Sequence, residues 1–413
     1  MTAEAARSAA RSKRRFAFGP GALVAAAFIG PGTVTTATVA GANFGFVLVW
    51  TLAIATGATI ILQDMAARLG AGARLGLGEA LVAGAGPRPI RYAAALLVFA
   101  ALAIGNAAYE AGNLAGGALG AAELLGTERK PAVAGLALLA GAALLFGRYR
   151  VLERILIALV LLMSLAFAAS AVLARPDLGA LATGLVPRIP DGGVLAAAAL
   201  VGTTVVPYNL FLHAAAARER WADASGVAEA RADTMVSIGL GGLISILVLT
   251  TAAAMLFGTG AEVSNAADMA RALEPAAGPL AGALVGLGLL AAGFTSAVTA
   301  PLATGYAISE IAPITDDRAK ARLQKGVALA VLLIGAATAL LDIRPVSLIL
   351  VAQAANGLLL PVIATVLLLV MNRRDLLGDH ANGRLANILG GAVVLFAFAL
   401  GARALLRVAG VWP

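Results

Sequence analysis

The chain has 413 residues, of which 61% are hydrophobic and only 13% are charged, and its formal net charge is +8. Its mean hydropathy of +0.93 excludes an ordinary soluble domain and predicts an all-α protein that crosses a lipid bilayer many times. The absence of cysteine excludes disulfides and thiolate metal sites, and the presence of only two histidines argues against a multi-histidine zinc site. The excess of lysine and arginine is expected in loops at the membrane surface, so we expect no nucleic-acid partner.

Eleven apolar segments, separated by charged or Pro/Gly-rich breaks, predict membrane spans. Their expected limits, in chain order, are 18–46, 47–70, 91–121, 131–148, 152–174, 193–217, 232–258, 277–311, 325–342, 345–371 and 385–409. Residues 1–17 form a basic tail that resembles the start of a signal peptide. The apolar segment that follows is too long and too interrupted for one, so we expect a tail in the cytoplasm.

Lysine and arginine are concentrated in alternate loops. If the N-terminus lies inside, the inside segments include basic groups such as Arg14, Arg15, Lys320 and Arg373, and the outside segments carry far fewer basic residues. The positive-inside rule therefore predicts a plasma (inner) membrane protein with a cytoplasmic N-terminus and an outside C-terminus.

Two of the expected spans are interrupted near their middle. The first is broken at Gly30-Pro31-Gly32 and the sixth at Pro207. Because the breaks lie five spans apart, the two halves have opposite orientation, and matched broken helices indicate a transporter binding site. The alternative is that each proline only kinks its helix, but the matching positions and the polar residues beside both breaks favour a site.

Several ordered motifs accompany these breaks. They are GPGT from Gly30, LQDMAARLGAGARLGLGEAL from Leu62, VPYNLFLHAA from Val206, GFTSAVTAPLATGYAISE from Gly293, LVAQAANGLLLPV from Leu350 and NRRDLLGDHANGR from Asn372. Together they resemble the Nramp (natural resistance-associated macrophage protein) transporters over nearly the whole chain.

That resemblance implies a LeuT-type fold. Residues 18–174 and 193–371 would form two inverted five-helix repeats, and 385–409 would form an eleventh helix. The resemblance further implies secondary active transport by alternating access, usually proton-coupled uptake of manganese, iron or a similar divalent metal.

The metal ligands of the family are mostly missing. Carried over by motif, its aspartate falls on Gly30, its asparagine on Thr33, its methionine on Val206, and the histidine after the proline on Tyr208, whereas its glutamine matches Gln353. A divalent cation must exchange its water shell for oxygen, nitrogen or sulfur ligands, normally including a carboxylate. A conventional manganese or iron site is therefore not expected here.

Neutral polar groups surround both breaks instead. Thr33 and Thr35 begin the second half-helix of the first span, whose free N–H groups and positive dipole end favour an anion; Thr36 and Thr38 are expected to bond their own preceding turn. The residues expected to bind substrate are Gly30, Pro31, Gly32, Thr33, Thr35, Thr203, Val206, Tyr208, Asn209, Gln353 and Asn356.

One carboxylate, Glu110, lies well inside the third span, with Asn106 and Asn113 near the same helix face. Burying a carboxylate in a membrane is costly, which favours a proton-pathway or gating role. A structural hydrogen bond and direct substrate ligation are the alternatives. His213, which matches the family, is expected in the proton pathway or in a structural role.

Three functions remain open from the sequence. The first is transport of a divalent metal, and a harder, more hydrated ion such as magnesium would tolerate the loss of the methionine better than the loss of the aspartate. The second is transport of a non-metal small solute such as an anion, carboxylate, amino acid or bicarbonate. The third is a non-transporting membrane sensor. The sequence shows no hydrolase triad or ATP-binding module, so we expect a non-enzyme. We also expect no cofactor and a monomer whose partners are its substrate and the lipid bilayer.

Overall fold

A computed structural model describes residues 19–83, 88–147, 150–260, 262–312 and 314–408, and throughout these ranges the chain is helical apart from its loops. The expected tail, residues 1–17, lies outside the described residues. The all-α prediction is confirmed.

Eleven expected spans correspond to thirteen long or paired helices. These are α2 (Pro20–Phe28) with α3 (Pro31–Phe44), α4 (Val49–Ala73), α6 (Arg88–Leu125), α7 (Arg129–Phe146), α8 (Arg150–Leu173), α10 (Val194–Thr204) with α11 (Pro207–Arg220), α12 (Val227–Leu256), α15 (Ala281–Ile311), α16 (Asp317–Ala339), α17 (Pro345–Met371) and α19 (Arg384–Val408). Short helices lie in the connections: α5 (Leu77–Val82), α9 (Leu178–Thr183), α13 (Ala266–Ala270), α14 (Glu274–Ala277) and α18 (Arg374–Leu377).

Within the described ranges, nine segments are long and apolar enough to cross a membrane, and one of them, Val194–Arg220, contains the broken pair α10 and α11. The broken pair α2 and α3 is not among the nine, and α8 qualifies only as a shorter apolar stretch, Val160–Leu173. The largest boundary difference is at α16, which begins at Asp317 and not near residue 325; α12 also begins early, at Val227 and not near residue 232. Asp316 caps α16 by accepting a hydrogen bond from the Ala319 N–H, so the helix begins before its apolar part. Hydropathy locates only the apolar part and therefore missed these polar first turns.

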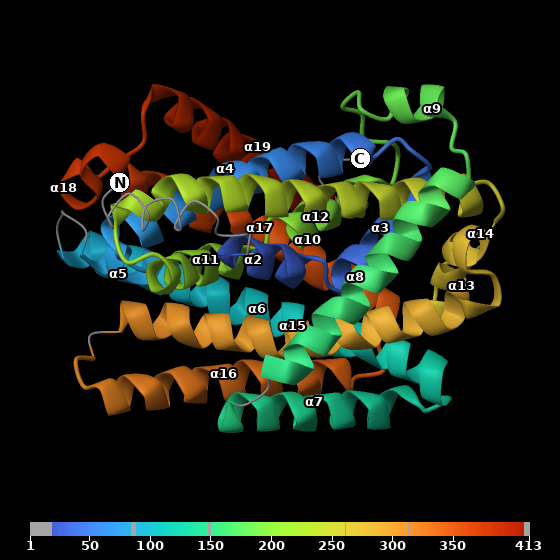
Figure 1. Ribbon diagram of the computed structural model, residues 1–413, viewed down its shortest axis with the longest axis horizontal. Helices are drawn as coiled ribbons and strands as arrows, with labels where there is room; N and C mark the ends of the chain where they lie inside the picture. The colour runs from blue at the N-terminus through green and yellow to red at the C-terminus, as the bar shows by residue number, and fades with distance from the viewer. Residues whose placement is uncertain (1–18, 84–87, 148–149, 261, 313, 409–413) are drawn as a thin grey trace, which may run out of the picture.

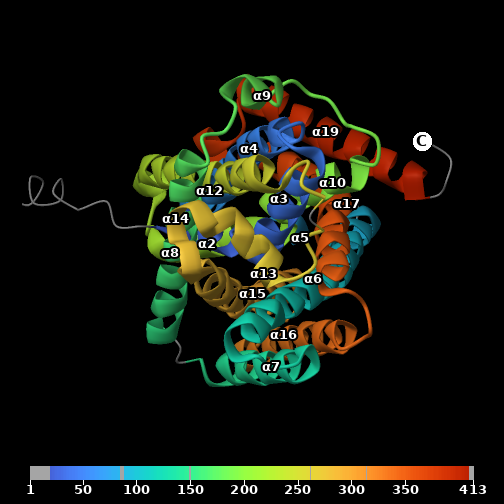
Figure 2. The ribbon, with the colours of Figure 1, turned by 90° about the vertical axis from the view of Figure 1, so that its right-hand side faces the viewer.

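The two broken helices form the middle of the molecule. α2 contacts α11 and α3 contacts α10, with α12 and α4 on one side and α6 and α15 on the other (Figure 2). α7 and α16 pair at the edge away from α19, and α8 crosses the long helices obliquely (Figure 1). Most long helices are roughly parallel or antiparallel, as the bilayer requires.

Glycines allow several helices to approach closely in this core. A β-carbon on Gly202 of α10 would lie 1.8 Å from the carbonyl oxygen of Gln353 in α17, and one on Gly293 of α15 would lie 2.5 Å from the Cα of Gly117 in α6. Neither site can hold a larger residue without moving backbone. Close packing of small residues is how helices associate in lipid, where burial from water gives little drive.

The first helix is anchored at its start. The carboxylate of Asp233 in α12 accepts hydrogen bonds from the N–H groups of Gly19 (3.1 Å) and Gly21 (2.6 Å). These are two of the first-turn donors that a helix leaves without intrahelical partners. The bond therefore ties the first half of the broken span to α12.

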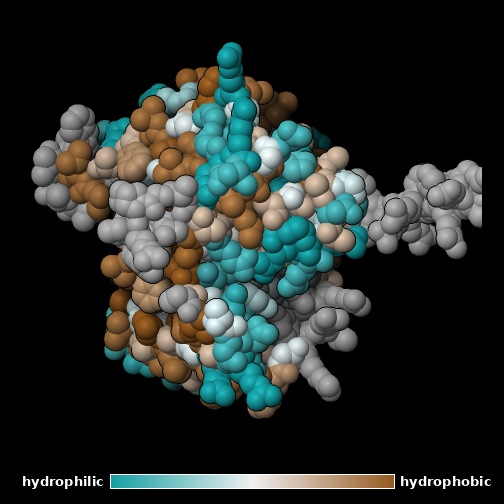
Figure 3. All heavy atoms as spheres, turned by 90° about the vertical axis from the view of Figure 1, so that its left-hand side faces the viewer, coloured by the Kyte–Doolittle hydropathy of each residue, from teal (hydrophilic) through white to brown (hydrophobic). Residues whose placement is uncertain are grey.

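The end of the molecule that carries α5 and α18 is polar. Figure 3 looks onto this end, where hydrophilic side chains gather over a broad area with hydrophobic side chains along much of the rim. Asp64 pairs with Arg68 at 2.9 Å and Arg231 at 2.7 Å, and Glu79 pairs with Arg218 at 2.6 Å. Arg68 also donates to the His380 carbonyl and the Asn382 side chain. Asp64 thus makes structural polar contacts.

Candidate functional site

The two helix breaks meet at the centre of the fold. α2 ends at Phe28 and α3 begins at Pro31, while α10 ends at Thr204 and α11 begins at Pro207. Across the gap the Thr33 and Thr203 hydroxyl oxygens lie 2.7 Å apart. Thr33 Oγ1 also donates to the Phe28 carbonyl, so Thr203 donates to Thr33. The two breaks therefore lie against each other.

The glycine after Pro31 makes room for α17. A β-carbon on Gly32 would lie 1.9 Å from Nε2 of Gln353, so no other residue fits without moving that side chain. Gln353 is 0% exposed, and neither of its amide atoms has a hydrogen-bond partner in the described part of the chain. A buried carboxamide without partners costs free energy, about 1–3 kcal/mol per group, and indicates a place for a ligand.

The space beside Gly30 is lined by hydroxyls. A β-carbon there would lie 3.1 Å from Ser296 Oγ of α15 and 3.7 Å from Tyr109 OH of α6. The Tyr109 and Tyr208 rings meet edge to face with centroids 5.6 Å apart. Sequence reasoning missed Tyr109 and Ser296, although both are polar residues in mid-span, Tyr109 next to Glu110 and Ser296 inside the quoted eighth-span motif.

The backbone acceptors at the breaks are largely occupied. In α2 and the first break, the Phe28 carbonyl accepts from the Thr33 hydroxyl, and the Gly30 carbonyl accepts from the Thr33 and Val34 N–H groups. In the second break, the Leu200 carbonyl accepts from the Thr204 hydroxyl and the Thr204 carbonyl from the Thr59 hydroxyl at 3.3 Å. Side-chain hydroxyls thus bond two carbonyls beside the breaks, those of Phe28 and Thr204, and one inside α10, that of Leu200.

Donors are in surplus at the same place. α3 and α11 each begin with proline, so their first-turn N–H groups, including those of Gly32 and Tyr208, have no carbonyl within their own helix. The Tyr208 hydroxyl is 0% exposed and unpartnered within the described ranges. The positive N-terminal ends of α3 and α11 lie at the breaks, together with the negative C-terminal ends of α2 and α10.

No carboxylate takes the place of the missing family aspartate. Val206 is buried and apolar, and the described residues contain no group of three or more His, Asp or Glu side chains able to hold a metal. Glu110 is fully buried, accepts from Asn113 Nδ2 at 3.2 Å, and packs with its Cγ 2.5 Å from a β-carbon position on Gly335 of α16. Its carboxyl group therefore lies in the α6–α16 contact beside the site.

The remaining expected residues spread away from the breaks. Asn106 donates to Thr304 of α15 at 2.6 Å, and its hydrogen bond does not reach Glu110. His213 Nδ1 lies 2.9 Å from Gln63 Oε1 of α4, a partner the sequence did not predict. Thr35 contacts Met269 Sδ of α13 at 3.9 Å.

Four buried side chains, two amides and two hydroxyls, have atoms without a hydrogen-bond partner in the described chain. Asn209 and Asn356 are buried with side-chain atoms that lack partners in the described chain. Thr36 and Thr38 do not make the expected bonds to their preceding turn: their buried hydroxyls are unpartnered in the same part of the chain.

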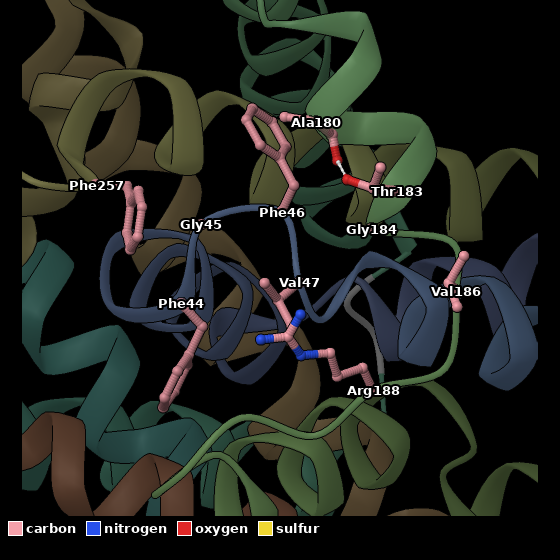
Figure 4. A pocket seen from close by; sticks show the side chains of 10 residues that line it. All are labelled: Phe44, Gly45, Phe46, Val47, Ala180, Thr183, Gly184, Val186, Arg188 and Phe257. Atoms are coloured by element: carbon pink, nitrogen blue, oxygen red, sulfur yellow. Dashed lines mark hydrogen bonds between the residues drawn. The ribbon is translucent and has the colours of Figure 1, made fainter.

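A hollow lies at the C-terminal end of α3. This cavity of about 440 Å³ has apolar walls formed by Phe44, Phe46, Val47, Val186 and Phe257, and Arg188 is its only charged lining residue. Figure 4 shows the Arg188 side chain extending into it beside Val47. The Trp50 indole donates to the Arg188 carbonyl at 2.9 Å, which fixes the segment that carries the guanidinium.

The chain is similar in sequence and in fold to known proteins. The natural resistance-associated macrophage protein-like (Nramp) family matches residues 21–407. The divalent metal cation transporter MntH of Ralstonia nicotianae is 31% identical, with 96% of this chain and 90% of the relative covered. A crystal structure of a mutant manganese transporter from Eremococcus coleocola is 24% identical, covers 94% of this chain and 85% of its own, and has a TM-score of 0.75. A crystal structure of MhsT in complex with L-phenylalanine is 15% identical, with 92% of this chain and 98% of that chain covered and a TM-score of 0.59, which shows a likeness of fold alone.

Proposed function

The chain belongs to the Nramp family of multi-pass membrane transporters with the LeuT-type fold. From that premise we propose that it carries a small solute or ion across the plasma membrane. Transport would proceed by alternating access about the paired helix breaks. The N-terminus would face the cytoplasm. The observation that carries the proposal is the Thr33–Thr203 contact, which brings the two interrupted helices together at mid-molecule.

A closed polar end supports one step of such a cycle. Glu79 and Arg218 pair between α5 and α11, and Lys320 of α16 lies 3.6 Å from Glu79. Asp233 holds the start of α2 against α12. Opening the site toward this end would require these contacts to break, which is the kind of two-state rearrangement that alternating access needs.

Two substrate classes follow from different observations. The relatives named as metal cation transporters favour a divalent metal. The uncharged breaks, where Gly30 and Val206 supply no ligand, favour a non-metal small solute. The sensor hypothesis gains no support from the relatives.

Glu110 is the proposed proton carrier. It is a fully buried carboxylate beside the site whose Oε1 has no partner in the described chain, while Oε2 accepts from Asn113. A group that can be neutral or charged at this depth can couple a proton to the rearrangement.

Uptake into proteoliposomes tests the proposal. The panel is manganese, magnesium, bicarbonate, acetate and glycine, each with and without a pH gradient. Thr33→Val removes the inter-break bond while keeping volume and should lower saturable uptake of whichever substrate is carried by about ten-fold or more. Thr338→Val, which removes a hydroxyl bonded only to its own helix at Ile334, is the matched control. Equal uptake by both variants would contradict the proposal.

A further inference from the structure

Glu310 is a buried carboxylate at the polar end of the molecule, far along the chain from Glu110. It lies in the last turn of α15, and its side chain is only 3% exposed. Two glycines at the start of α5 enclose it. A β-carbon on Gly76 would lie 2.0 Å from Glu310 Oε1, and one on Gly78 would lie 2.7 Å from Glu310 Cβ. The space beside α5 is therefore filled by this one carboxylate.

Glu310 has fewer partners than the carboxylate beside it. Its Oε2 accepts from the Gly78 N–H at 3.1 Å, and its Oε1 has no hydrogen-bond partner within the described residues. The one cation within 4.0 Å of it in the described chain is Arg218 of α11. Glu79, by contrast, accepts from a backbone N–H, pairs with Arg218 at 2.6 Å and lies 3.6 Å from Lys320. Glu310 thus depends on a single arginine that it shares.

The charge balance of this cluster depends on where α11 lies. The charged side chains that act on Glu310 in the described chain are Glu79 of α5, Arg218 of α11 and Lys320 of α16. When both carboxylates are ionised, the four charges sum to zero. Arg218 lies on the second half of the broken sixth span, so it moves with that half-helix.

Opening the path from the breaks to the polar end requires the bond between Glu79 and Arg218 to break, because it joins α5 to α11. Glu79 would keep its backbone N–H and Lys320. Glu310 would keep only the Gly78 N–H and would be left without a cation. A buried carboxylate without a cation is very costly, and binding a proton removes its charge.

We propose that Glu310 is a proton-binding group that takes up a proton from the aqueous phase when α11 moves away and this path opens. The proton binds Oε1, the oxygen that has no partner within the described residues. Closure returns Arg218 and releases the proton to water. The inference rests on the proposed alternating access, and it adds a second proton site separate from Glu110. Because the open state binds the proton and the closed state does not, a lower pH favours the open state.

Distances between two spin labels test this proposal without knowledge of the substrate. The chain contains no cysteine, so labels attach only where a cysteine is introduced. Ala222 follows α11 and Thr315 follows α15, and both are exposed. The full chain carrying Ala222→Cys and Thr315→Cys is measured in lipid nanodiscs by pulsed electron resonance. The two conditions are about pH 5, near the ordinary pKa of glutamate, and about pH 8, well above it.

The labelled chain should show a short distance for the closed state and a longer one for the open state. The ratio of open to closed protein should rise about ten-fold from the higher pH to the lower. Glu310→Gln keeps the size of the side chain and cannot titrate, so its ratio should be equal at both pH values and match the unsubstituted chain at low pH. Glu79→Gln is the matched control from the same cluster, and its ratio should still change with pH because Glu310 remains.

Two results would overturn the inference and leave alternating access intact. The first is a pair of distances whose ratio ignores pH while Glu310 is present. The second is a pH response that survives in Glu310→Gln, including one that is lost only in Glu79→Gln. A single short distance in every variant at both pH values would instead remove the opening itself, and with it the proposed alternating access.

Discussion

The centre of this molecule and its polar end handle buried polar groups in opposite ways. At the end formed by α4, α5, α11 and the α17–α19 connection, charges are paired: Asp64 with two arginines, and Glu79 with Arg218. Around the helix breaks the side chains are neutral, and Tyr208 and Gln353 have unpartnered atoms within the described residues. The polar end also keeps unpartnered buried atoms, on Trp221, Glu310 and Arg373. The contrast is therefore that the end pairs its charges within the chain, whereas the unpaired neutral groups at the breaks are left for a ligand.

The largest expected effect comes from a steric clash at the α10–α17 contact. Gly202→Ala should destabilise the protein by at least about 3 kcal/mol or prevent its insertion, because the added carbon would lie 1.8 Å from the Gln353 carbonyl oxygen, which belongs to the backbone. Gly239→Ala has nothing within 4 Å and is the control. Yield and thermal unfolding of purified protein measure both, and similar yields and unfolding temperatures would contradict the close α10–α17 contact.

Glu110→Gln separates coupling from binding at the centre. The amide is the same size but cannot take up and release a proton. We therefore expect uptake in a pH gradient to fall to the rate measured without a gradient, while substrate counterflow continues. Paired measurements of gradient-driven uptake and counterflow in proteoliposomes check this. Glu262→Gln, in an exposed pair with Arg344, should change neither. Retained gradient-driven uptake in Glu110→Gln would assign that carboxyl a structural role.

Arg68→Ala tests how complete the polar end is. The change leaves Asp64, the His380 carbonyl and the Asn382 side chain without one partner each, and we expect a loss of about 2–3 kcal/mol. Arg344→Ala removes an exposed pair and should cost less than about 1 kcal/mol. Thermal unfolding in one detergent compares the two, and an equal shift would mean that the network contributes no more than a surface pair.

Arg188→Gln should have the smallest effect. The guanidinium acts on approach, so uptake of the anionic members of the substrate panel at low concentration and low ionic strength should fall a few-fold, with the difference disappearing at high salt. Initial uptake rates at two salt concentrations measure it, and Arg344→Gln, another exposed arginine, is the control. A salt-independent loss in Arg188→Gln would indicate a structural role for that side chain.

The sequence predicted much of this arrangement. Hydropathy located the spans, and Pro31 and Pro207 located the breaks, because proline and glycine act on the backbone wherever they occur. The quoted motifs identified the family, and they showed that the aspartate and methionine positions hold Gly30 and Val206. These features depend on residue type and position along the chain, which are local properties.

Contacts between distant helices required the tertiary structure. Nothing local pairs Thr33 with Thr203, places Ser296 and Tyr109 beside Gly30, joins His213 to Gln63, or turns Glu110 toward Gly335 while Asn106 bonds Thr304. The start of α16 at Asp317 was missed because hydropathy locates only the part of a helix inside the bilayer, whereas the Asp316 cap sets where the helix itself begins. Thus the sequence by itself determined the class, the breaks and the absent ligands, and the packing of α6, α15 and α17 around those breaks decided which donors remain free for a substrate.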